Sequence, residues 1–228
     1  MSQNHGTPID DGKPLRSDAG RNRDRIVVAA RSVFAREGLT ASMASVARQA
    51  DVGIATLFRR FPTKAELIEA VFADRMDAYV DTVATALADP DPWSGFTGYI
   101  ETVCGMQAAD RGFAGVLTMT FPMATTLESR RHEAYNGLVQ LAERAKAAGR
   151  LRDDFTAEDM VLLLMANAGV IAATIDTAPT AWSRVVALII QGLQAPARAA
   201  LPAAPKPSDL YQAMLGAASV APSRRTTN

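Results

Sequence analysis

The side chains best suited to chemistry lie between residues 42 and 64, and their types favour recognition of a polyanion. This segment combines small or apolar residues with a hydroxyl and then with cations, in the order Gly53, Ile54, Ala55, Thr56, Arg59, Arg60 and Lys64. At the start of a short helix, small residues leave backbone N–H groups open to a phosphate or to a base edge. Arginine and lysine one turn later are the residue types that neutralise phosphates.

The charge distribution of the chain agrees with this interpretation. The 228 residues hold 24 Lys and Arg against 24 Asp and Glu, so the net charge is zero. Between residues 16 and 64, however, ten basic residues stand against four acidic ones, and the remainder is acidic by the same margin. A basic segment on an acidic body indicates a polyanionic partner for that segment, although a solvated basic face would give the same count.

Catalytic and metal chemistry find little support in the sequence. It contains no His/Cys cluster with zinc spacing and no Gly-rich phosphate loop, so no cofactor or metal is expected. The single cysteine, Cys104, cannot form an intramolecular disulfide, which favours a reducing, cytoplasmic setting. The apolar stretch from Met160 to Ile175 is interrupted by Asn167 and is interpreted as a buried helix, not as a membrane span.

The elements that would position these side chains are all helical. Apolar residues recur at helical spacing from Ile26 to Phe34, before Gly38. Ser42 can cap a short second helix, and a third is expected over 54–61 with Leu57, Phe58 and Phe61 facing inward. Thr63 can cap a long fourth helix, and further helices are expected over 93–108, 112–121, 125–148, 156–174 and 181–200. The prediction is an all-α chain of about nine helices.

The two ends of the chain differ from this helical body. Residues 1–20 mix Gly, Pro, Asp and Ser and are expected to be disordered. Residues 201–228 are rich in Pro, Ala and Ser and are expected to be largely mobile, although Ser208 could cap a short helix that ends near Leu215.

Two short helices joined by a tight turn, between a first helix and a long fourth one, form a helix-turn-helix layout. The stretch from Arg25 to Phe72 closely resembles the N-terminal domain of the TetR family of transcriptional regulators. Residues that stand where the family pattern has them are Gly38, Val46, Ala47, Val52, Thr56, Leu57, Phe61 and Lys64. Asp51 departs from that pattern, which usually has Gly there, and Gly53 and Phe58 stand where the family often has Ser and Tyr.

The resemblance implies a DNA-binding domain over 21–66 and a ligand-binding and dimerisation domain over 67–200. It implies that Arg60 and Lys64 hold phosphates, and the residue types add candidates for DNA contact on the second helix and along the third. These candidates are Ser42, Arg48, Gly53, Ile54, Ala55, Thr56, Phe58, Arg59, Arg60 and Lys64. Arg21, Arg23 and Arg25 are further candidates as a flexible basic arm.

A small effector is expected among large, often flexible side chains of the central helices. The candidates are Met76, Tyr79, Phe96, Tyr99, Met106, Met119, Phe121, Met123, Leu127, Tyr135 and Asn167. Each of these could equally be a core residue, and Asn167 needs a hydrogen-bond partner inside an apolar helix.

The resemblance also implies a homodimer formed by the last two helices, on apolar and small residues of 161–172 and 185–193. The function expected is a repressor released from a palindromic operator in double-stranded DNA by an apolar or amphipathic effector. Two alternatives stay open: an architectural or partner-binding protein of the same fold without an effector, and an enzyme or carrier that kept the helical body.

Overall fold

The computed structural model describes residues 15–219, and within that range it is all-helical. The helices are α1 Leu15–Glu37, α2 Met43–Gln49, α3 Ile54–Arg60, α4 Lys64–Leu87, α5 Pro92–Ala109, α6 Arg111–Thr118, α7 Thr125–Ala147, α8 Ala157–Thr174, α9 Ala181–Leu193 and α10 Pro207–Ser219. This confirms the predicted fold class, with one helix more than expected. Predictions for residues 1–14 and 220–228 lie outside the described residues.

Local sequence signals account for the helix boundaries near the N-terminus. Gly38 ends α1 with a φ of 75°, a left-handed conformation that costs glycine little. Ser42 caps α2 by accepting a hydrogen bond from the N–H of Ser45 at 3.0 Å. Thr63 caps α4 in the same way with the N–H of Glu66 at 3.1 Å.

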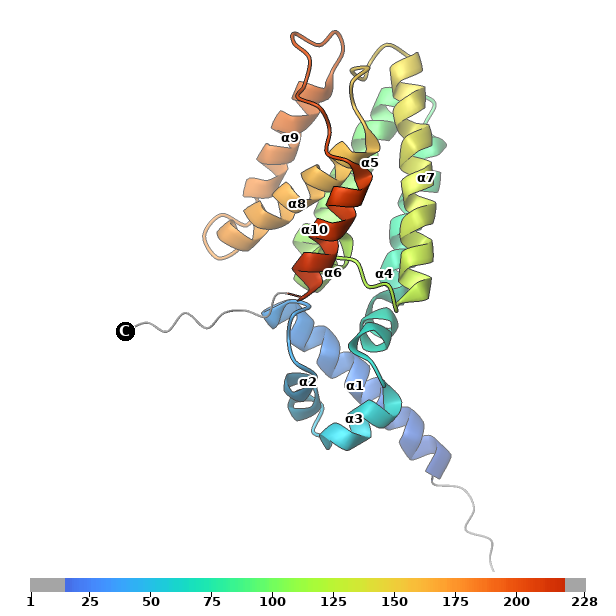
Figure 1. Ribbon diagram of the computed structural model, residues 1–228, viewed down its shortest axis with the longest axis vertical. Helices are drawn as coiled ribbons and strands as arrows, with labels where there is room; N and C mark the ends of the chain where they lie inside the picture. Colours follow the sequence, from blue (N-terminus) through green and yellow to red (C-terminus); the bar gives the residue numbers. More distant parts are fainter. Residues whose placement is uncertain (1–14, 220–228) are drawn as a thin grey trace, which may run out of the picture.

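The molecule has two parts joined by α4 and α6. Figure 1 shows α1, α2 and α3 at one end, with α4 running from them into a bundle formed by the other helices. In that bundle α4 packs along α5 and α7, while α6 packs on both α1 and α8. The three helices at the end and the body therefore meet through two elements, α4 and α6.

Aromatic packing joins the two parts at the centre of the molecule. Phe72 of α4 lies between Phe34 of α1 and Phe113 of α6, with ring centroids 6.2 and 6.3 Å away. Gly112 of α6 approaches this stack so closely that a Cβ atom there would lie 2.8 Å from Phe72 Cζ. The absence of a side chain at Gly112 therefore permits α6 to pack on α1 and α4.

The last expected helix, 181–200, is shorter in the structure because α9 ends at Leu193. Pro196 disfavours helix at the preceding residue, and the carbonyl of Leu193 accepts a bond from the N–H of Arg152 at 3.0 Å. The sixth helix likewise ends at Thr118 and not at Phe121.

The two ends of the chain are more ordered than expected within the described range. Helix α1 begins at Leu15, inside the segment expected to be disordered, and α10 forms a full helix inside the tail expected to be mobile. Leu210 and Met214 of α10 are buried at 8% and 7% exposure. Their i, i+4 spacing puts both on one face of the helix, and this face packs on the body.

Within residues 15–219, α8 alone has the length and apolar composition of a membrane-crossing helix. A core helix of a soluble protein meets the same criterion, and α8 packs against α5, α6, α7 and α9.

Candidate DNA-binding surface and ligand pocket

The short helix α3 is anchored by one side and exposed on the other. Leu57 is fully buried, whereas Ile54 and Phe58 are 44% and 45% exposed. The expectation that Phe58 faces inward is therefore wrong, because the short helix offers only one face to the core and Leu57 occupies it. Ile54 and Phe58 give α3 an apolar outer face of the kind that can contact thymine methyl groups.

Polar and cationic groups flank this apolar face. Arg59 donates from Nη2 to the hydroxyl of Thr56 at 3.4 Å, so these two side chains lie together. Arg60 is exposed and has no hydrogen bond or ion pair among residues 15–219. Lys64 is half-buried at the start of α4, and burial lowers the pKa of its ammonium group. Arg60 is therefore available to bind an anion. Burial has already removed part of the water around the Lys64 ammonium group in the free protein.

The remaining candidates lie on α2 and at the start of α3. Ser42 and Arg48 are exposed, and Arg48 Nη2 donates to the Ser45 hydroxyl at 3.3 Å. Gly53 precedes α3 without a side-chain cap, and Gly53 and Ala55 are exposed. The first N–H groups of α3 are therefore not covered by a capping side chain.

The turn between α2 and α3 is held from α1 by Arg25. Its Nη2 donates to the carbonyls of Ala50 at 2.8 Å and Asp51 at 3.2 Å, and lies 3.7 Å from the Asp51 carboxylate. Asp51 has a φ of 51°, which explains why the TetR pattern favours glycine at this position. Arg23 lies over the ring of Phe61 at 5.5 Å. Arg23 and Arg25 thus brace the helix-turn-helix and do not form the flexible arm that was expected.

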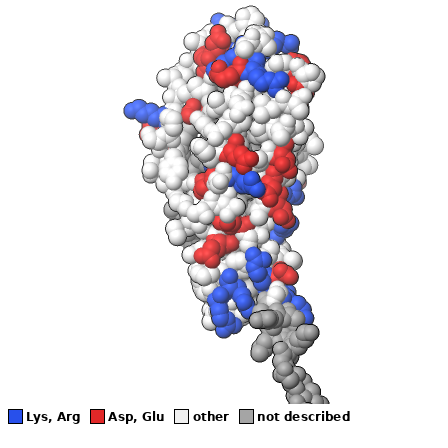
Figure 2. All heavy atoms as spheres, turned by 90° about the vertical axis from the view of Figure 1, so that its right-hand side faces the viewer, with Lys and Arg blue, Asp and Glu red and all other residues white. Residues whose placement is uncertain are grey.

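Cationic side chains gather at this end of the molecule. On the face seen in Figure 2, Lys and Arg cluster at the lower end, and Asp and Glu spread over the middle of the body. On this face the basic segment of the sequence therefore forms a basic end, and Lys and Arg at the opposite end lie among Asp and Glu.

The body contains a cavity of about 580 Å³ between α4, α6, α7, α8 and α10. Its walls are formed by Tyr79, Leu117, Glu128, Arg131, His132, Tyr135, Leu138, Ala157, Glu158, Met160, Val161, Leu164, Pro207, Ser208, Leu210, Tyr211, Gln212 and Met214. A volume of this size lies in the range of about 300–1,000 Å³ that is typical of small-molecule sites.

Two of the eleven ligand-site candidates, Tyr79 and Tyr135, line this cavity. Tyr99 donates from its hydroxyl to that of Tyr79 at 3.1 Å, and burial raises the pKa of both phenols. Tyr99 itself lines a second hollow, of about 430 Å³, between α4 and α5. The tyrosine pair thus lies between the two spaces.

The other candidates lie elsewhere. Met76, Phe96 and Leu127 are core residues with at most 1% exposure, and Met106, Met119 and Phe121 pack against that core. Met123 is 71% exposed, because it follows Pro122 in the turn before α7. The amide nitrogen of Asn167 has partners, since Nδ2 donates to Gln107 Oε1 at 2.8 Å and to the Cys104 carbonyl at 3.3 Å, whereas its Oδ1 is buried without a partner among residues 15–219. Hydrophobicity and size did not distinguish a core residue from a cavity wall.

Sequence reasoning missed most of the cavity wall, including its charged groups and the residues from α10. The spacing of Leu210 and Met214 was a usable signal, since it indicated a helix with one apolar face. Glu128, Arg131 and Glu158 carried no comparable signal, because charged residues on long helices are usually solvated.

A third surface lies on α8 and α9. Leu162 and Leu188 are 39% and 57% exposed, and small residues such as Gly169 and Gly192 lie in the open beside them. Leu164 and Leu193, which were expected at a dimer interface, are instead buried within the chain. The two helices therefore present an apolar face that no other part of residues 15–219 covers.

Comparison with known proteins gives separate matches for the helix-turn-helix end and for the helical body. The sequence model for bacterial regulatory proteins of the tetR family matches residues 26–71, and that for the C-terminal domain of SbtR-like transcriptional regulators matches residues 91–195. Together the matches cover more than half of the chain. No curated protein sequence matches it.

Three solved structures of similar proteins illustrate the range of sequence identity and TM-score. A TetR regulatory protein from Mycobacterium vanbaalenii is 30% identical, with 79% of this chain and 99% of that chain covered and a TM-score of 0.43. PfmR from Thermus thermophilus is 19% identical, with 75% and 99% covered and a TM-score of 0.56. FadR from Bacillus subtilis, in complex with stearoyl-CoA, is 14% identical, with 75% and 98% covered and a TM-score of 0.55.

The two matched domains correspond to the helix-turn-helix end and to the helical body, so the sequence families and the fold agree. The chain therefore belongs to the TetR family of DNA-binding transcriptional regulators.

Proposed function

We propose that this protein is a homodimeric, cytoplasmic repressor that binds a palindromic operator and leaves it when a small effector binds in the body. The observation that carries the proposal is the outer face of α3, where exposed Arg59 and Arg60 accompany half-buried Thr56, with Lys64 following four residues after Arg60 at the start of α4.

The proposed DNA contacts come from two kinds of side chain, those that would contact bases and those that would contact phosphates. Ile54, Phe58 and Thr56 would meet base edges in the major groove, because they are apolar or carry a single hydroxyl on the outer face. Arg60 and Lys64 would hold phosphates, which fix orientation but carry little sequence information. Ser42 and Arg48 would hold the phosphate backbone on the α2 side.

The dimer rests on the open apolar face of α8 and α9. Two half-site readers need a two-fold axis, and an isologous contact through Leu162 and Leu188 would supply one. The two copies of α3 would then enter successive major grooves, about 34–36 Å apart.

Release by an effector rests on the position of the cavity relative to α4 and α6. Tyr79 of α4 and Leu117 of α6 both line the cavity, and the same two helices pack against α1. A ligand that changes the position of either helix would change the separation of the two α3 helices. It can do so only by its difference in affinity for the two dimer shapes, typically about 1–3 kcal/mol of coupling.

The test is selection of bound fragments from source genomic DNA by the purified protein, followed by titration of the recovered site. A palindromic site bound far more tightly than random DNA is expected, with one dimer per site by light scattering. A monomer in solution, or equal affinity for all DNA, would contradict the proposal. Operator binding that no small molecule alters would favour an architectural or partner-binding protein.

A further inference from the structure

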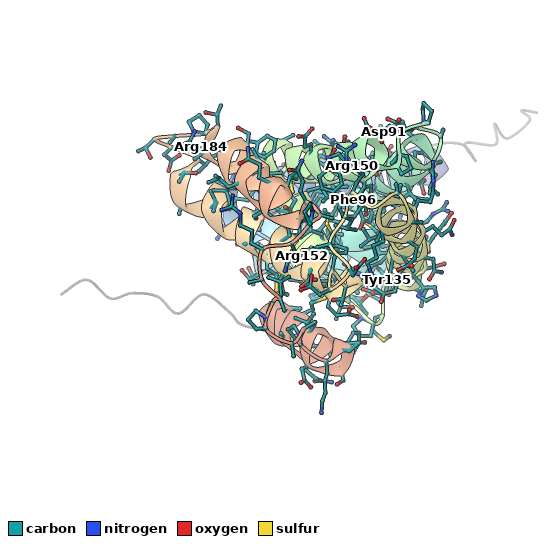
Figure 3. All side chains as sticks on the ribbon, turned by 90° about the horizontal axis from the view of Figure 1, so that it is seen from above. Asp91, Phe96, Tyr135, Arg150, Arg152 and Arg184 are labelled. Atoms are coloured by element: carbon teal, nitrogen blue, oxygen red, sulfur yellow. The ribbon has the colours of Figure 1, made fainter. Side chains whose placement is uncertain are left out.

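The C-terminal helix α10 lies outside both family matches, the second of which ends at residue 195. Figure 1 shows α10 lying along the outside of the body, and in the view of Figure 3 it lies at the edge of the molecule, with the labelled Tyr135 of α7 on the side toward it. Its buried side chains are Leu210 and Met214, and the carbonyl of Met214 accepts a bond from the N–H of Thr120 at 3.4 Å. This helix is an addition to the two matched domains and docks through a small apolar contact.

The segment that leads to α10 is fixed to the body just before the helix. Arg152 donates from Nη2 to the Ala199 carbonyl at 2.7 Å, and the Asp154 carboxylate accepts from the N–H of Leu201 at 2.8 Å. Arg152 and Asp154 also pair with each other, and this pairing lowers the pKa of the Asp154 carboxyl. Only residues 202–206 separate this anchor from α10, so the helix is held close to the cavity.

With α10 docked, the cavity has a volume of about 580 Å³ and is partly open to solvent. Leu210, Tyr211 and Met214 of α10 face Leu138 and Leu164 of the body across this space. A helix that filled the site would have to leave before a ligand could bind, whereas this helix leaves room for one. Its position is therefore that of an outer wall.

The charged groups that line the cavity are Glu128, Glu158 and Arg131, with the imidazole of His132 beside them, and this acidic excess disfavours an anionic ligand. The guanidinium of Arg131 donates to the Val116 and Met119 carbonyls at 2.7 and 2.8 Å, and it pairs with Glu128 at 3.2 Å. These contacts hold the C-terminal end of α6, so the one arginine of the cavity is already engaged. Glu158 accepts a bond from the Tyr135 hydroxyl at 3.4 Å and has no ion pair among residues 15–219.

We infer that α10 forms the outer wall of the effector site, and that this site takes an uncharged apolar molecule in preference to a carboxylate, sulfonate or phosphate. The inference rests on the proposed function for the role of the cavity, and it adds the contribution of α10 and the class of ligand. The apolar wall supplies the affinity, while Glu158 and the engaged Arg131 disfavour an anion.

Two fluorescent probes with nearly the same apolar body test the ligand class. N-phenyl-1-naphthylamine is uncharged, and 8-anilino-1-naphthalenesulfonate adds one negative charge. We expect the full chain to bind the uncharged probe at least tenfold more tightly, and we expect Glu158→Gln to reduce this preference at least twofold. Absence of binding by the uncharged probe, equal affinity for both probes, or an unchanged preference in Glu158→Gln would overturn the inference about ligand class.

Substitutions in the full chain test the wall. Leu210→Ser combined with Met214→Ser removes the docking contact, and Tyr211→Ala removes a cavity-facing ring that is 44% exposed and does not anchor the helix. We expect at least tenfold weaker binding of the uncharged probe for the double variant and a smaller loss for Tyr211→Ala. Ala213→Ser, on the exposed side of α10, is the matched control and should leave affinity unchanged.

Unaltered affinity in both the double variant and Tyr211→Ala would show that α10 is not part of the site. DNA binding is measured on the same proteins and separates the two proposals. If DNA binding is present while the probe results fail, only the inference about α10 falls. If the full chain does not bind DNA while the probe results hold, the repressor proposal falls and the ligand site stands.

Discussion

A substitution at Gly112 tests the joint between the helix-turn-helix and the body. In Gly112→Ala the new Cβ would lie 2.8 Å from Phe72 Cζ and 3.3 Å from Phe34 Cβ. Phe72 is 1% exposed, and its ring lies between those of Phe34 and Phe113, so it has little room to move away. The substitution therefore forces α6 away from α1 and α4.

The expected cost follows from these distances. Overpacking of a filled core costs about 1–3 kcal/mol, and alanine in a helix returns at most about 1 kcal/mol relative to glycine. The middle of the overpacking range, less this return, gives a fall in the free energy of unfolding of about 1–2 kcal/mol. For a chain of this size this corresponds to a decrease in Tm of about 2–8 °C, measured by thermal unfolding at one fixed protein concentration because dimers depend on it.

Gly98→Ala is the matched control, since Gly98 lies within α5 and has no atom within 4 Å of an added Cβ. Here only the helix preference of alanine acts, and Tm should rise slightly. Phe72→Leu supplies a second check, because leucine lacks the Cζ atom. The double variant of Gly112→Ala and Phe72→Leu should be at least about 1 kcal/mol more stable than the sum of the single effects. An unchanged or raised Tm in Gly112→Ala, or strict additivity, would refute the packing argument.

Three further predictions concern the DNA-binding helix α3 and the buried core. Arg60→Ala should lower the slope of log affinity against log salt by about 1.8 for a dimer, from about 0.9 per phosphate contact, while Arg150→Ala, an exposed arginine of the body, should leave it unchanged; equal slopes in both would reject the phosphate assignment. Thr56→Ala should weaken operator binding by about 1–3 kcal/mol more than binding to random DNA, and equal losses on both would make Thr56 a packing residue. Cys104 is buried, and burial raises the pKa of its thiol to about 12; the folded protein should therefore resist iodoacetamide at pH 8 and react once unfolded, and rapid alkylation of the folded protein would contradict this.

The helix-turn-helix could be predicted in detail because its signals are local. Ser42 and Thr63 cap the helices that they were expected to cap, and Gly38 ends α1 as expected. Caps and turns depend on residues within three or four positions of each other, so a sequence pattern contains them. The position of half-buried Thr56 beside Arg59 follows from one helical turn of spacing.

Arg23 and Arg25 on α1 make contacts that are distant in sequence, so the expectation that they form a flexible arm was wrong. Arg25 contacts Ala50 and Asp51, about 25 residues away in the chain, and Arg23 lies over Phe61. A basic residue before a helix-turn-helix has the same sequence appearance whether it reaches DNA or braces the turn. Only the crossing of α1 over the α2–α3 turn decides between these roles.

The cavity also depends on which helices meet. By composition and spacing alone, the sequence determined an all-α chain, a basic DNA-binding segment at one end and a set of large apolar residues in the body. It did not determine which of those residues line a space, since Met76 and Tyr79 lie one turn apart on α4 and only Tyr79 reaches the cavity. The tertiary structure decided this, together with the docking of α10, because a cavity is a gap between helices distant in sequence and its walls are fixed by how those helices pack.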